Sequence, residues 1–177
     1  MPTIMRNGHS GTIIQNGIAY GGKYDGSAEL NAMKDMYDSL VMRTVTDIDY
    51  VGVDYIGGSA FYRCNNLANV SFPNVTNIGG YAFYRCNNLE VMEIGSKTNF
   101  KEQVFNSSTN FSTLILSNDN LSTILSNTFN NCPFNNGTAT LYVPNALIND
   151  YLSAPNWSTI LAYPNVNIMP IEGSIYE

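Results

Sequence analysis

Charged side chains are scarce in this sequence, and the basic ones are confined to its first part. Lys, Arg, Asp and Glu make up 12% of the 177 residues, and the formal net charge is −6. Every Lys and Arg lies at or before Lys101, so the last third carries only acidic charge. Nucleic acids and anionic membranes both require clustered basic side chains. The sequence therefore argues against both as partners.

Cysteine, histidine and long apolar runs are also scarce. The three cysteines are an odd number, which excludes a closed disulfide framework. The single histidine, His9, has no neighbouring metal ligands, and the sequence has no Gly-rich phosphate loop, Ser/His/Asp grouping or paired carboxylates. No apolar run approaches the length of a membrane span, and no secretion signal is visible at the start. We therefore expect a protein without catalytic activity, cofactor, metal or membrane insertion.

What the sequence does contain is a repeat. IGGSAFYRCNNLANVSFPNVTN begins at Ile56, and IGGYAFYRCNNLEVMEIGSKTN begins 22 residues later at Ile78. A fixed period of this length is typical of a solenoid, whose coils bury their apolar faces only by stacking on one another. Because 44% of the residues are apolar, we expect a single domain with a sizeable core.

Two weaker copies extend the array, and Thr44–Tyr55 has the alternation of an entry strand before it. The third copy keeps the 22-residue register, with apolar residues at Phe100, Phe105, Phe111, Leu114 and Leu116. A fourth, looser copy repeats the spacing with Ile124, Phe129 and Cys132, followed by an insertion before Leu141. The repeats are therefore predicted to occupy residues 44–143.

The flanking segments have different patterns. Asn16-Gly17, between two short β-type runs, predicts a hairpin within residues 1–27. Apolar residues at three- and four-residue spacing predict a capping helix over residues 28–43. Residues 144–177 are predicted to be a C-terminal cap. In this cap a short helix runs between Pro144 and Pro155, Trp157 covers the last coil, and a final strand lies around Ile168.

The pattern IGxxAFxxCxxL…V.FP, which begins at Ile56, resembles the BspA-like leucine-rich repeat family. The similarity covers roughly Val45 to Ile171, and LYVPNALINDYLSAPNWSTI resembles the segment that closes many such arrays. The resemblance implies an α+β leucine-rich-repeat solenoid of about four short coils, built from parallel strands and short helical turns. It also implies surface-associated adhesion. The start, Asn16 to Gly22, is similar to short starts of phage or prophage structural proteins.

Each repeat position has a physical role in such a solenoid. Strand alternation points Val70 and Phe72 inward and their neighbours outward. One Phe from each coil should form an aromatic ladder through the core, namely Phe61, Phe83, Phe105 and Phe129. The glycine pairs after the first strand of each coil mark a sharp bend where a side chain would obstruct. Cys64, Cys86 and Cys132 are interpreted as buried free thiols rather than a disulfide or metal set.

Two surfaces are candidates for binding. The first is the outward stripe of the strands, consisting of Asn69, Ser71, Val91, Glu93, Thr113 and Ile115. This is the face that repeat proteins commonly use for partners. The second is a ladder of Tyr62, Arg63, Tyr84 and Arg85, residue types that are favoured in binding hot spots. Stacked Tyr rings and splayed Arg heads are also what a short exposed helix presents, so this alternative stays open.

Two functions are consistent with these observations. The first is a non-catalytic surface protein that recognises a protein or glycan, on the cell surface or outside the cell. The second is a phage-derived particle component, located in the virion, whose residues 1–27 assemble or form a homo-oligomer while the repeats project outward. The partner itself is not identified by the sequence.

Overall fold

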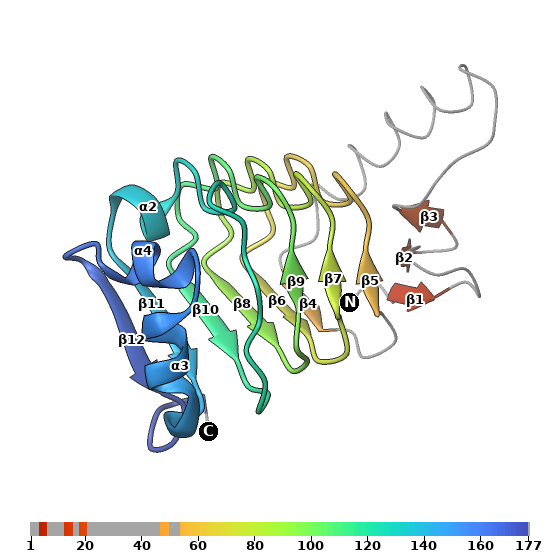
Figure 1. The fold of residues 1–177 in the computed structure, drawn as a ribbon. Coiled ribbons are helices and arrows are strands. Elements are labelled where there is room, and N and C mark those ends of the chain that lie inside the picture. Colours follow the sequence, from red (N-terminus) through yellow and green to blue (C-terminus); the bar gives the residue numbers. More distant parts are fainter. Residues whose placement is uncertain (1–3, 7–12, 16–17, 21–46, 50–53, 177) are drawn as a thin grey trace.

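The computed structural model of the chain describes residues 4–6, 13–15, 18–20, 47–49 and 54–176. Its coils stack side by side along one axis, with two sets of parallel strands on either side of the core (Figure 1). The capping helix predicted over residues 28–43 lies outside the described residues, as does His9. Among the helices of the described ranges, none has the length and apolar character needed to span a membrane.

The larger sheet contains six strands, all parallel. In spatial order they are β12 (Val166–Pro170), β11 (Ala139–Val143), β10 (Thr113–Leu116), β8 (Val91–Ile94), β6 (Asn69–Phe72) and β4 (Asp47–Asp49). Asn69 pairs with Val91, and Val91 pairs with Thr113, so the 22-residue repeat is confirmed as the register of the sheet. Thr113 pairs with Thr140, because the insertion of the fourth copy lengthens that connection.

Two smaller sheets complete the strands. The first is parallel and contains β5 (Tyr55–Ile56), β7 (Asn77–Ile78) and β9 (Asn99–Phe100). The second is antiparallel and contains β1 (Ile4–Arg6), β2 (Ile13–Gln15) and β3 (Ile18–Tyr20). Gln15 in β2 pairs with Ile18 in β3, as expected for a hairpin with a two-residue connection.

The segment between the two parallel sheets is not the short helix that we expected. In the first coil it is a series of turns, closed by hydrogen bonds from Tyr62 N–H to the Ser59 carbonyl and from Cys64 N–H to the Phe61 carbonyl. The φ angles of Ser59 and Arg63 are 58° and 59°. Left-handed residues cannot continue a right-handed helix, so they break the segment into turns. Backbone hydrogen bonds also join the turns of adjacent coils, such as Phe61 N–H to the Ala82 carbonyl at 2.8 Å.

The phenylalanine ladder predicted from the repeat is confirmed. Ring centroids are 4.8 Å apart for Phe61 and Phe83, 5.9 Å for Phe83 and Phe105, and 5.4 Å for Phe105 and Phe129. All four rings are buried. The ladder lies between the two parallel sheets, since its members also contact Phe72 of β6 and Phe100 of β9. It therefore ties both sheets to one core.

The glycine pairs differ in how tightly the coils enclose them. A Cβ atom on Gly79 would lie 2.5 Å from the backbone nitrogen of Gly58 and 2.9 Å from the carbonyl carbon of Gly57. Among the described residues, a Cβ atom on Gly58 would meet the carbonyl oxygen of Gly80, at 3.4 Å. Only the added Cβ atom at position 79 would therefore clash with the backbone of the neighbouring coil. Gly79 is thus required by the close approach of two stacked coils.

The cysteines are buried and free, which confirms their interpretation as core thiols. The Cys86 thiol donates to the Phe61 carbonyl, and the Cys132 thiol donates to the Phe129 carbonyl. Burial raises the pKa of Cys86 well above its ordinary value, and it raises the pKa of Cys132 to about 12. Neither thiol carries the thiolate character that a reactive cysteine needs.

The end of the chain is helical before it rejoins the sheet. Its elements are α2 (Pro133–Asn136), η2 (Asn145–Leu147), α3 (Ile148–Ser153) and α4 (Trp157–Leu161), followed by β12. Trp157 is buried, contacts Phe129 at 5.9 Å, and donates its indole N–H to the Ser122 carbonyl. The sequence placed Trp157 correctly against the last coil but missed that it begins α4. The division of the chain into four segments stays a prediction.

Candidate functional site

The tyrosine–arginine ladder, defined as Tyr62, Arg63, Tyr84 and Arg85, lies on the turn segments of two adjacent coils. The rings of Tyr62 and Tyr84 stack with centroids 5.2 Å apart and an interplanar angle of 7°. Arg63 and Arg85 each place a guanidinium 5.3 Å from the ring centroid of the preceding tyrosine. The 22-residue register therefore brings together the four residues that the sequence predicted.

The ladder is open to solvent, and a third tyrosine extends it. Tyr62 is 45% exposed, both arginines are exposed, and Tyr84 is half-buried. Tyr81 is 37% exposed, and its ring lies 5.8 Å from that of Tyr84. Its hydroxyl accepts a hydrogen bond from Gln103 of the next coil at 3.0 Å. Sequence reasoning missed Tyr81, although its position three residues before Tyr84 in a turn was a usable signal.

The strand stripe, defined as Asn69, Ser71, Val91, Glu93, Thr113 and Ile115, lies along the outer face of β6, β8 and β10. Asn69 and Glu93 are exposed, while Ser71, Val91 and Thr113 are half-buried. Asn69 donates a hydrogen bond to the Asp47 carboxylate of β4 at 2.7 Å. The stripe therefore combines polar and apolar side chains. Of its two exposed members, Asn69 is already hydrogen-bonded to a neighbouring strand.

Ile115 is a correction to the predicted stripe. Strand alternation places it on the outer face, yet only 2% of it is exposed. In the sheet it lies between Glu93 and Tyr142. Tyr142 is in edge contact with Tyr176 at 4.8 Å, so residues that follow β12 return to this face near β11. Ile115 thus belongs to a small covered region and is not a free binding residue.

The residues after β12 return to the outer face of the sheet near β11, and the repeat pattern does not predict this. Ile171 N–H donates to the Val143 carbonyl at the end of β11, and the Glu172 carboxylate accepts from Asn145 N–H at 2.9 Å. These contacts direct the residues after β12 back toward β11. The pKa of Tyr176 is raised by burial and by Tyr142. The sequence gives little signal for this return, because Tyr176 lies outside the repeat and its neighbour Ile175 is 90% exposed.

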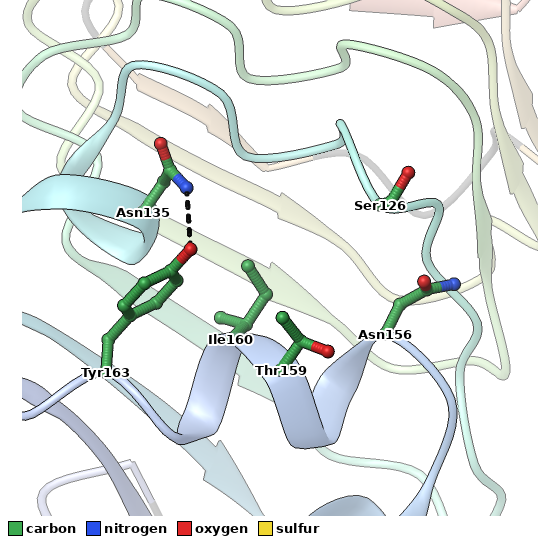
Figure 2. A pocket seen from close by; sticks show the side chains of 6 residues that line it. All are labelled: Ser126, Asn135, Asn156, Thr159, Ile160 and Tyr163. Carbon is green, nitrogen blue, oxygen red and sulfur yellow. Dashed lines mark hydrogen bonds between the residues drawn. The ribbon is translucent and has the colours of Figure 1, made fainter.

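A small pocket lies between α2 and α4, as Figure 2 shows. Its lining residues are Ser126, Asn135, Asn156, Thr159, Ile160 and Tyr163. Asn135 donates a hydrogen bond to the Tyr163 hydroxyl at 3.3 Å, and Asn156 donates to the Ile124 carbonyl at 2.9 Å. The volume is about 60 Å³, whereas ligand pockets have volumes of roughly 300–1,000 Å³. This pocket therefore has room for a few waters.

The described ranges contain no cluster of side chains suited to metal binding. No group of three or more His, Cys, Asp or Glu residues there is arranged to hold a metal ion. The groups with clearly raised pKa values are Cys86, Cys132, Tyr151 and Tyr176. For each of them burial is the leading cause, and three belong to the core. What the described surface offers is contact area and hydrogen-bond donors.

Comparison with protein families gives one match. A model described as a BspA type leucine-rich repeat region matches residues 43–149, in six copies. Comparison with curated proteins and with solved structures finds no match. The matched range includes the tyrosine–arginine ladder and the strand stripe. The number of coils, expected to be about four, stays a prediction.

Proposed function

Because the chain belongs to the BspA-type leucine-rich repeat family, we propose that it is a non-catalytic, surface-associated protein that adheres to a partner through its repeats. Repeats of this family indicate protein interaction. Stacked coils suit that role, since they present an extended surface on which each position recurs at a fixed spacing. A protein is therefore the preferred ligand, with a glycan as the alternative.

The observation that carries this proposal is the exposed aromatic surface of the tyrosine–arginine ladder. Tyr62, Tyr81 and Tyr84 are in ring-to-ring contact outside the core, next to two exposed arginines. Most large aromatic side chains of the repeats are buried by comparison. Tyr and Arg are enriched among the residues that dominate binding energy at protein interfaces. The ladder is therefore the first place to look for a partner.

A binding array tests this proposal. The full chain is applied to immobilised extracellular-surface proteins and to glycans, and the experiment is repeated with Tyr62→Ser/Tyr84→Ser. Tyr163→Ser is the matched control, because Tyr163 is 37% exposed and lies far along the chain. We expect binding to at least one protein, a loss of tenfold or more in the double variant, and little change in the control. Binding to no array member would contradict the proposed function.

A particle component is the second candidate, and the antiparallel sheet of β1, β2 and β3 favours it. This sheet is separate from the two parallel sheets of the repeats. Three strands of three residues each bury little surface on their own. Such a sheet needs further packing to be stable, and in this proposal another chain supplies it. Light scattering compares the mass of the full chain with that of a chain lacking residues 1–27. An oligomer that becomes monomeric on truncation supports assembly, and two monomers contradict it.

A further inference from the structure

We propose that the tyrosine–arginine ladder binds an acidic segment of a partner protein, with Arg63 and Arg85 as the carboxylate-binding residues. This inference rests on the proposed function and adds the chemical class of the partner to it. It depends on three features of the ladder, which are the pairing state of the arginines, their backbone conformation and the tyrosine rings beneath them.

The two arginines are adjacent cations, each of which lies over a tyrosine ring. Arg63 N–H donates to the Tyr84 carbonyl at 2.8 Å, and Arg85 N–H donates to the Asn106 carbonyl at 3.0 Å, so the two residues occupy equivalent places on neighbouring coils. Because the coils stack directly on one another, these two like charges are close together and repel each other. Within the part of the chain that the structure describes, neither guanidinium pairs with a carboxylate. An incoming carboxylate would relieve this repulsion.

The backbone of the coil does not explain why arginine is present. Arg63, Arg85, Ser107 and Asn131 occupy the same turn position, with φ angles of 59°, 56°, 62° and 53°. A left-handed conformation is unfavourable for a long side chain and is tolerated best by Gly, Asn and Asp. The chain itself uses Asn and Ser at this position in later coils. The fold therefore accepts a smaller residue, and the two arginines are retained against conformational preference.

The tyrosines hold the guanidinium groups in place before a ligand arrives. Each guanidinium lies 5.3 Å from the centroid of a tyrosine ring, and the two rings are stacked at 7°. Contact with an aromatic face stabilises an exposed cation, because the ring face carries negative charge density. Restricting the arginines in the free protein lowers the entropy lost on binding. The guanidinium N–H donors remain available to carboxylates, which they bind in a bidentate manner.

An acidic protein segment fits this arrangement better than the other anionic polymers. Alternate side chains of an extended peptide point to one side at a spacing of about 6.6 Å, so two carboxylates of one acidic segment can face two arginines on neighbouring coils. Tyr81 and Tyr84 add aromatic area beside the charges, as protein interfaces commonly do. A nucleic acid would require a larger basic surface, and the chain as a whole carries a net charge of −6.

The test measures binding of a hexaglutamate peptide to the full chain by calorimetry, with hexaglutamine as the neutral control peptide. We expect hexaglutamate to bind, hexaglutamine not to bind, and the affinity to fall as salt is raised. Arg63→Asn/Arg85→Asn should weaken binding at least tenfold. Its melting temperature should equal or exceed that of the wild type, since Asn131 shows that the coil accepts Asn at φ 53°.

A matched variant separates the ladder from overall charge. Lys97→Asn/Lys101→Asn also removes two positive charges, but from exposed positions elsewhere in the repeats. This variant should bind hexaglutamate like the wild type. Equal losses in the two variants would overturn the assignment, as would undiminished binding by the arginine variant. Failure to bind hexaglutamate at millimolar concentration, or arginine-dependent binding of a sulfated polysaccharide alone, would also overturn it. In each of these cases the proposed function would still hold if the arginine variant kept its binding to the protein array.

Discussion

The thiol of Cys86 donates a hydrogen bond to the backbone carbonyl of Phe61 in the preceding coil, at an Sγ–O distance of 2.9 Å. One coil later, the hydroxyl of Ser108 donates in the same way to the carbonyl of Phe83, at 2.6 Å. The two side chains are thus interchangeable at this rung. What the coil requires here is a small buried donor that links it to the coil before.

This equivalence predicts that Cys86→Ser folds normally and resists alkali better than the wild type. Burial raises the pKa of Cys86 in the folded state, so the thiol stabilises the fold fully below its unfolded pKa of about 9. That contribution is lost as the pH rises toward the folded pKa, because only the unfolded chain releases the proton. Chemical denaturation of both proteins between pH 7 and pH 11 checks this. Equal losses of unfolding free energy would contradict it.

Phe83→Ala should be among the most destabilising single changes in the repeats. The Phe83 ring is completely buried and stacks between Phe61 and Phe105. Removing a buried aromatic ring costs about 3–5 kcal/mol of unfolding free energy. Tyr62→Ala is the control, because Tyr62 is 45% exposed and should cost less than about 1 kcal/mol. Thermal melting measures both, and an unchanged melting temperature for Phe83→Ala would refute the stacked core.

Gly79→Ala should destabilise the protein much more than Gly58→Ala, although both glycines belong to the glycine pairs of adjacent coils. The new methyl group at position 79 would lie 2.5 Å from the Gly58 backbone nitrogen, and neither backbone can move without separating the coils. Overpacking of this kind costs about 1–3 kcal/mol. At position 58 the closest atom of the described residues is 3.4 Å away, so the change should be close to neutral. Urea titration of both variants tests the difference, and similar midpoints would argue against close approach at Gly79.

Ile115→Ala should destabilise the protein although Ile115 lies on the outer face of its strand. Only 2% of Ile115 is exposed, so its truncation should cost about 2–5 kcal/mol. Glu93→Ala, at the same place one coil earlier, should stay within about 0.5 kcal/mol, because Glu93 is exposed. Equal effects of the two changes in urea denaturation would show that Ile115 is not buried in solution.

Most of the solenoid could be predicted because its signal is periodic. The register of β6, β8 and β10 and the ladder from Phe61 to Phe129 both follow from a 22-residue repeat in which equivalent residues stack. The tyrosine–arginine ladder could be placed for the same reason. Its neighbour Tyr81 was missed because it does not recur in the repeat: the equivalent residue of the preceding coil is Ser59.

The repeat period did not predict the burial of Ile115, the helix at Trp157 or the left-handed turns. Ile115 looks exposed by strand alternation, yet it is buried beside Tyr142, which is in ring contact with Tyr176. The helix that begins at Trp157 was missed because its five residues carry few of the usual signals. The left-handed turns at Ser59 and Arg63 were missed because neither residue type favours φ > 0.

The sequence by itself determined that coils stack at a 22-residue period, which residues face the core and which four form the tyrosine–arginine ladder. It could do so because a repeat converts sequence spacing directly into spatial neighbourhood. Only the tertiary structure decided that Arg63 and Arg85 lie over tyrosine rings without a carboxylate partner in the described residues, and that Ile115 is covered. Those properties depend on backbone conformation and on contacts between distant segments, which no local pattern encodes.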